Sequence, residues 1–350
     1  MVDEPQAPEA MAPSLKITGL HVAGYRSIQK LDWPEDGLGW DGKIPDVVLV
    51  GGANGSGKTT LLEGLFGVFA GLEYPRLNER AMFPGARELC LHLSVRSKEL
   101  GGHRSLRLVI GDEKFQHAHA LPGCYALGRR GPEARAPDGW LEFLEAAKNP
   151  VLIARGAMPR VIYFPTDRQL VFPTSNKRSL ERPADPNQMA WRFVPASTYE
   201  ESLINFLTWE RFEDLSAKEE GTTEHATHFA AYADAFHRFV GGGKQLIWQR
   251  GNLMVRTADG TMHGMPELSS GEKQVLLFAA DLHRRWSPGA LVLIDEPELH
   301  LHDAWQSTLF RFICDLQRER GGQVILATQS SHFFGLGEVG SKIVLRKGWP

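Results

Sequence analysis

Residues 47–70 hold the feature that most constrains the fold of this chain. Four apolar residues, 47–50, run directly into the glycine-rich stretch Gly52-Ala53-Asn54-Gly55-Ser56-Gly57-Lys58-Thr59, and apolar residues then recur at helical spacing over 60–70. A buried strand, a G-x-x-x-x-G-K-[ST] loop and a helix in this order predict a loop whose backbone N–H groups surround phosphates. We therefore predict an α/β fold built on a parallel or mixed sheet.

The residues of this loop have separate expected roles. The helix N-terminus adds positive partial charge. Lys58 is expected to reach the β- and γ-phosphates of a nucleotide and to act in catalysis, and Thr59 is expected to bind Mg²⁺ through its hydroxyl. The predicted nucleotide-binding residues in and directly after the loop are Gly52, Asn54, Gly55, Ser56, Gly57, Lys58, Thr59 and Thr60.

A second motif ends another apolar strand with two acids. Residues 291–294 are Leu-Val-Leu-Ile, and Asp295, Glu296 and Pro297 follow. A hard cation held by water and phosphate oxygens needs a further carboxylate, so Asp295 is the predicted metal ligand. Glu296 points differently and is the predicted catalytic residue that polarises an attacking water. The alternative is that these acids only cap a helix, and the phosphate loop upstream favours the metal interpretation.

A third motif, Leu268-Ser269-Ser270-Gly271-Glu272-Lys273-Gln274, begins a helix. Taken alone, serine followed three residues later by glutamate is a helix cap. The motif lies after the phosphate loop and a long insertion, and the acidic strand follows about twenty residues later. This order and spacing indicate that the motif is more than a helix cap.

These three motifs resemble the Walker A, signature and Walker B sequences of ATP-binding cassette (ABC) ATPases. Three segments are similar in sequence to the SMC/RecF branch of these ATPases: GYRSI at 24–28, LSSGEKQ at 268–274 and LIDEPELHLH at 293–302. This branch includes the OLD-type ATPases of bacterial defence systems. The resemblance covers about 15–65 and 265–335. It implies a P-loop NTPase of the ABC-ATPase head type, with an antiparallel β insertion and a helical lobe that bears the signature motif.

The resemblance also implies partners for the site. Two copies would sandwich ATP and Mg²⁺ head to head, so that Ser269, Ser270 and Gly271 bind the nucleotide held by the other copy. Arg26 would contact the nucleotide; a solvated turn arginine is the alternative.

The resemblance extends to the loops beyond the main motifs. Gln329 stands where such ATPases commonly carry a switch histidine, which indicates slow or conditional hydrolysis, because glutamine cannot carry a proton charge. Such ATPases also carry a glutamine in a segment called the Q-loop. Gln169, which follows the expected strand over 161–164, is the candidate for it.

Four parts are expected along the chain: a disordered tail over 1–14, a nucleotide-binding lobe with the β insertion over 15–164, a Pro-rich loop and helical lobe over 165–267, and a C-terminal core over 268–350. Antiparallel strands are expected within 88–121, helices over 198–240 and about 303–319, and two short strands before Leu268. His117 and His119 are expected on the surface of a strand.

Composition limits the location and the partners. The chain has 39 Lys+Arg and 42 Asp+Glu, a net charge of −3, so any contact with DNA must come from a local surface. Its longest apolar runs fall far short of the roughly 20 residues of a membrane helix, and we expect no membrane association. The three cysteines match no metal or redox spacing, which favours reduced thiols in the cytoplasm.

We therefore predict an ATP-binding and hydrolysing switch that forms an ATP-dependent homodimer. It is expected to act with DNA or with an effector protein, such as a nuclease encoded nearby, in anti-phage defence or DNA maintenance. The alternatives are an ABC transporter-type subunit, or a regulatory ATPase that holds an effector without binding DNA. Too little sequence follows Gln329 for the nuclease domain that OLD proteins append, so any nuclease is expected on another polypeptide.

Overall fold

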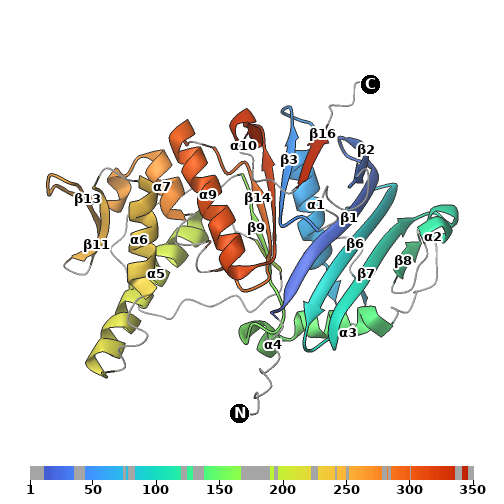
Figure 1. The fold of residues 1–350 in the computed structure, drawn as a ribbon, viewed down its shortest axis with the longest axis horizontal. Coiled ribbons are helices and arrows are strands. Elements are labelled where there is room, and N and C mark those ends of the chain that lie inside the picture. The colour runs from blue at the N-terminus through green and yellow to red at the C-terminus, as the bar shows by residue number, and fades with distance from the viewer. Residues whose placement is uncertain are drawn as a thin grey trace, which may run out of the picture.

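The computed structural model shows an α/β protein with two larger sheets (Figure 1). The structure describes residues 12–34, 44–73, 76–77, 83–119, 124–128, 138–166, 190–192, 196–221, 228–240, 243–249, 252–277, 282, 285–299, 301–335 and 341–345. Most of the expected 1–14 tail, most of the Pro-rich loop and Gln169 lie outside these residues.

The central sheet has six strands, and all of its pairings are parallel. Its order is β10 (Ala190–Arg192), β9 (Val161–Phe164), β14 (Leu291–Asp295), β15 (Gln323–Thr328), β3 (Val47–Gly52) and β16 (Ser341–Leu345). All residues of β9, β14 and β15 are buried, because helices or the second sheet cover both faces. The predicted fold class is confirmed.

The second sheet joins the N-terminal strand to the region after the first helix. Its order is β2 (Ile28–Trp33), β1 (Ser14–Tyr25), β6 (Glu88–Ser97), β7 (Gly102–Gly111) and β8 (Cys124–Gly128). The β6–β7 pair is antiparallel as predicted, whereas β7 and β8 run parallel. Because β6 pairs with β1, the region is not a self-contained insertion. A two-stranded hairpin, β4 (Leu72–Glu73) with β5 (Arg76–Leu77), follows the first helix.

The strand prediction for His117 and His119 is wrong, because both lie in helix α2 (Glu113–His119). The side chain of Asp112 accepts a hydrogen bond of 2.8 Å from the backbone N–H of Phe115 and caps the helix.

Helix α1 (Lys58–Ala70) packs between the two sheets. Its apolar side chains join one core with residues from β1, β6, β9 and β14, together with α3 (Asp138–Lys148) and α4 (Pro150–Ala154). The second sheet therefore covers α1, and the phosphate loop at the start of α1 lies where the two sheets meet (Figure 1).

The other face of the central sheet is covered by helices. The predicted helices over 198–240 and 303–319 are confirmed as α5 (Ala196–Glu219), α6 (His228–Val240) and α9 (Asp303–Arg320). Between them lie the signature helix α7 (Ser270–Leu277) and a sheet of three strands rather than two, β11 (Gln245–Gln249), β12 (Asn252–Arg256) and β13 (Met262–Gly264). A 3₁₀ turn, Met265–Glu267, leads into α7. No helix in the described part of the chain is long and apolar enough to cross a membrane.

Candidate nucleotide-binding site

Three neighbouring strands bring the predicted site residues to one edge of the central sheet. In the register of β3, β15 and β14, Val50 pairs with Ala327 and Ala327 with Asp295. Because all three strands are parallel, their carboxyl ends meet at this edge. The loop after β3, Gln329 after β15 and Glu296 after β14 are therefore neighbours, although the sequence separates the first from the others by more than 200 residues.

The loop after β3 has a backbone that only glycine adopts without strain. Gly52, Gly55 and Gly57 have φ values of 153°, 78° and 103°. A Cβ on Gly57 would lie 2.8 Å from Ser27 Oγ, and one on Gly52 would lie 2.5 Å from the carbonyl oxygen of Leu345. A Cβ on Gly55 would meet no atom within 4 Å. The loop is thus packed on its inner side and open at Gly55, a form that fits a phosphate group.

Lys58 is almost fully buried, with 4% of its side chain exposed. Its Nζ donates a hydrogen bond of 3.0 Å to the carbonyl oxygen of Gly52 and lies 4.0 Å from Glu296 Oε1. These partners satisfy a buried ammonium that would otherwise be costly. The ammonium is therefore held inside the loop that it is predicted to serve.

The first turn of α1 contains no acidic residue, and its N-cap is Gly57, which offers no side chain. The positive end of the helix therefore lacks an anion of its own, as expected for a helix that receives a phosphate. Thr59 and Thr60 lie in this turn, and Asn54 and Thr59 are exposed whereas Ser56 is buried.

The acidic pair after β14 has contrasting environments. Asp295 is fully buried, and the hydroxyl of Thr166 donates a hydrogen bond of 2.6 Å to its Oδ2. Glu296 is 16% exposed and has a φ of 45°, a left-handed conformation that is costly for a residue with a side chain. Its N–H donates to the carbonyl of Ala327 at 2.7 Å, which holds this strained turn against β15.

Oxygen atoms from Thr59 and Asp295 are the donor type that Mg²⁺ prefers, and the site fits such an ion in its chemistry. Thr166 was not predicted from the sequence. It follows β9, which pairs with β14, and only this strand pairing brings it to Asp295.

The turn at Arg26 packs against the phosphate loop, since Ser27 Oγ faces Gly57. Arg26 itself has a φ of 47°, and its Nη1 donates to Glu63 Oε2 at 3.2 Å. The Arg26 side chain is 54% exposed, so this pair is a surface ion pair of small energetic value. The turn is thus beside the loop, with the arginine head directed to α1.

The signature residues lie elsewhere. Ser269 caps α7 in a capping box: its Oγ accepts from the N–H of Glu272, and its N–H and hydroxyl both donate to Glu272 Oε2, at 2.9 and 2.8 Å. Ser270 and Gly271 form the first turn. Figure 1 shows α7 on the far side of α9 from α1, so the chain does not bring these residues to its own phosphate loop.

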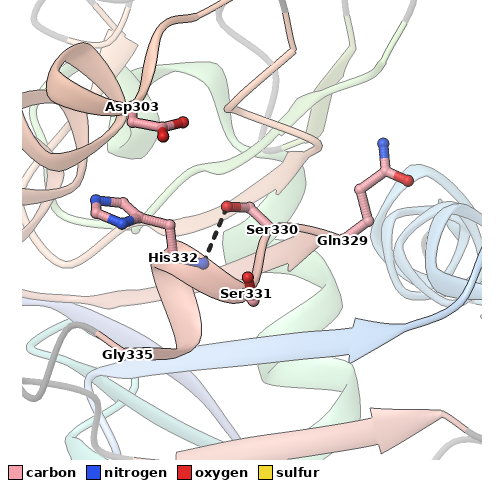
Figure 2. Close-up of a pocket in the computed structure, with 6 residues that line it drawn as sticks. All are labelled: Asp303, Gln329, Ser330, Ser331, His332 and Gly335. Atoms are coloured by element: carbon pink, nitrogen blue, oxygen red, sulfur yellow. Dashed lines mark hydrogen bonds between the residues drawn. The ribbon is translucent and has the colours of Figure 1, made fainter.

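Gln329 is one of the residues that line a polar cavity of about 590 Å³, together with Asp303, Ser330, Ser331, His332 and Gly335. In Figure 2 the side chain of Gln329 points away from Ser331 and His332. His332 Nε2 lies 2.6 Å from Ser307 Oγ, which ties the cavity wall to α9.

Residues 262–334 match a family profile described as "AAA domain, putative AbiEii toxin, Type IV TA system". This span contains the signature motif, Walker B and Gln329. The predicted resemblance is confirmed. The "Retron Ec83 probable ATPase" of Escherichia coli is 34% identical over 88 residues, which are 22% of this chain and 16% of that protein. The chain thus matches only a small part of the length of this relative.

Two solved structures match this chain at low sequence identity. An SmcHead bound to the C-winged helix domain of ScpA is 16% identical, with a TM-score of 0.49, and the match covers 91% of this chain and 90% of that one. The SMC head domain from Thermotoga maritima is 14% identical, with a TM-score of 0.44 and coverage of 91% of both chains.

Proposed function

We propose that this chain binds ATP at the 52–59 loop and hydrolyses it as a nucleotide-dependent switch. The observation that carries the proposal is the meeting of a phosphate loop, a buried lysine and two carboxylates at one sheet edge, with Lys58 Nζ only 4.0 Å from Glu296 Oε1. A lysine and a carboxylate so placed can act on the same terminal phosphate and its attacking water.

In this proposal Thr59 and Asp295 hold Mg²⁺, which neutralises phosphate charge when bound. Lys58 exchanges the Gly52 carbonyl for phosphate oxygens, and the loop N–H groups orient the chain of phosphates. Glu296 orients the attacking water and accepts its proton. The Gln329 amide can donate to the water or to the γ-phosphate, but it cannot take up a proton at neutral pH.

We further propose that Ser269, Ser270 and Gly271 complete the site of a second copy. Their distance from the phosphate loop of the same chain supports this arrangement (Figure 1). ATP would then hold two copies together, and hydrolysis would let them separate.

The defence role and the partners belong to the same proposal. The short match to a retron ATPase supports action in anti-phage defence beside an effector protein. Direct DNA contact would need a local surface, since the net charge is −3. One experiment distinguishes binding to an effector protein from binding to DNA. The tagged chain is purified from cells that carry its neighbouring genes, with and without nuclease treatment. Co-purification that survives the nuclease supports an effector protein, and co-purification that depends on nucleic acid supports DNA.

The central test is the variant Glu296→Gln, which keeps the shape of the site but removes the base. With ATP and Mg²⁺ we expect it to form a dimer, measured by light scattering after gel filtration, that outlives the wild-type complex. The double variant Glu296→Gln/Lys58→Ala is the control and should remain monomeric. A monomeric Glu296→Gln protein with nucleotide bound would contradict the sandwich.

A further inference from the structure

Glu298, three residues after Asp295, is a buried carboxylate for which the proposed chemistry has no use. Only 7% of the residue is exposed. Its Oε1 accepts three hydrogen bonds from consecutive residues: from Thr328 Oγ1 at 2.6 Å, from the N–H of Gln329 at 3.0 Å and from the N–H of Ser330 at 3.2 Å. Its Oε2 is also buried and has no hydrogen-bond partner among the described residues.

A buried carboxylate is costly, and charge-assisted hydrogen bonds are what offset the cost. The three donors come from Thr328, the last residue of β15, and from the turn that follows it. The contact therefore fixes the backbone on both sides of Gln329, and with it the origin of the Gln329 side chain.

A second set of contacts ties the same turn to the residues after β14. Ser330 Oγ donates to Gln306 Oε1 at 3.0 Å, and Gln306 Nε2 donates to the carbonyl of Leu301 at 3.0 Å. The N–H of Leu301 in turn donates to the carbonyl of Glu298 at 2.9 Å. Figure 2 shows Ser330 turned toward His332 while Gln329 points the other way. The turn, Glu298, Leu301 and the first turn of α9 are thus linked by hydrogen bonds.

We propose that Glu298 is a positioning residue that holds Gln329 in place at the terminal phosphate and couples it to Leu301 and the first turn of α9. This inference rests on the proposed ATPase function. Because Glu298 reaches the nucleotide only through Gln329, its loss should affect the hydrolysis step and leave nucleotide affinity nearly unchanged.

The test compares Glu298→Gln with the matched control Glu319→Gln, whose side chain on α9 is 69% exposed. We expect Glu298→Gln to lower kcat for ATP about tenfold or more, while the Kd for a fluorescent ATP analogue changes less than about threefold. In the nucleotide-free protein, the amide protons of Gln329 and Ser330 should exchange with solvent faster than in wild type. The control should match wild type in all three measurements.

A double variant isolates the route through Gln329. If Glu298 acts through Gln329, adding Glu298→Gln to Gln329→Ala lowers kcat no further than Gln329→Ala alone. If Glu298→Gln does not fold, Thr328→Val removes one donor to the same carboxylate and should shift kcat in the same direction by a smaller factor.

Three outcomes would overturn the inference: an unchanged kcat in a folded Glu298→Gln protein, a loss of nucleotide affinity as large as the loss of kcat, or fully additive effects in the double variant. Wild-type protein without ATP hydrolysis would instead refute the proposed function, and this inference with it. Normal hydrolysis in both wild type and Glu298→Gln would refute this inference alone.

Discussion

At the scale of single residues, the site depends on how its buried polar groups are satisfied. Thr166 donates to Oδ2 of Asp295 at 2.6 Å, and Asp295 is fully buried. A hydroxyl at this distance from an ionised carboxylate makes a strong hydrogen bond and limits the rotation of the carboxylate. Thr166 therefore holds Asp295 in one orientation, as the proposed Mg²⁺ site requires.

The variant Thr166→Val keeps the shape of the side chain and removes the hydroxyl. We expect it to raise the Mg²⁺ concentration that gives half-maximal binding of an ATP analogue by about tenfold, since a hydrogen bond to a charged group contributes about 1.5 kcal/mol. Thr166→Ser retains the donor and should stay near wild type. A magnesium titration monitored by fluorescence checks both, and equal behaviour of the two variants would exclude the role.

The sequence motifs predicted the site residues that lie within a local pattern. They missed the site residues that come together only through the pairing of distant strands. Lys58 and Glu296 followed from local patterns, and the structure brings them within 4.0 Å. Thr166 meets Asp295 across 129 residues, through the pairing of β9 with β14. No local pattern carries that pairing. Glu298 lay inside a recognised motif, but its contacts with the end of β15 and the turn after it depend on the register of the sheet.

At the scale of elements, the signature helix α7 is anchored at its first turn. Lys244, just before β11, donates to Glu272 Oε1, while Glu272 Oε2 accepts from Ser269. Burial raises the pKa of Glu272, but the hydrogen bonds from Lys244 and Ser269 outweigh it and hold the pKa below the usual value of 4.5. This contact connects the three-stranded sheet β11–β13 to the first turn of α7, whose residues are proposed to reach the other copy.

We expect Lys244→Gln to weaken ATP-dependent dimerisation about fivefold without altering the affinity of the single chain for ATP. The substitution removes the ion pair that holds Glu272 and, through it, Ser269, whereas the phosphate loop keeps all of its contacts. Lys244→Arg is the matched control. Analytical ultracentrifugation of both variants in the Glu296→Gln background measures the effect. Unchanged dimerisation in a folded Lys244→Gln protein would contradict the anchoring role.

The same contact has a definite pH dependence. Since the folded pKa of Glu272 is lowered, its stabilisation is present above about pH 4.5 and is lost as the pH falls below that value through the folded pKa. Lys244→Gln should therefore lose less stability than wild type between pH 5 and about pH 3, as measured by urea unfolding. If both proteins lose the same free energy of unfolding over this pH range, the contact between Lys244 and Glu272 is not the source of the pH dependence.

The elements predicted well are those with long periodic patterns, such as α5, α6 and α9. The short ones were missed or misread. Helix α2 depends on a single cap at Asp112, and β13 has only three residues, so neither has a pattern long enough to read. The pairing of β1 with β6, which makes one sheet of two distant segments, is likewise absent from local sequence.

At the scale of the whole molecule, one buried side chain joins the two sheets. Gln323, the first residue of β15, is fully buried. Its Nε2 donates to the carbonyls of Ile17 and Pro45, both at 2.9 Å, and its Oε1 accepts from the N–H of Ile17 at 2.8 Å. Because Ile17 lies in β1, a buried polar contact connects the central sheet to the second sheet.

Replacing Gln323 with leucine should therefore destabilise the fold more than its volume change suggests. The variant leaves the N–H of Ile17 and two carbonyls without their side-chain partner, and we expect a loss of about 3 kcal/mol in the free energy of unfolding. The control is Trp33→Phe, which removes a single hydrogen bond of 2.9 Å from Nε1 to Ser341 Oγ at another contact between the sheets, and should cost nearer 1 kcal/mol. Urea unfolding followed by far-UV circular dichroism compares the two. A Gln323→Leu protein as stable as Trp33→Phe would mean that apolar packing around α1, rather than this polar contact, holds the sheets together.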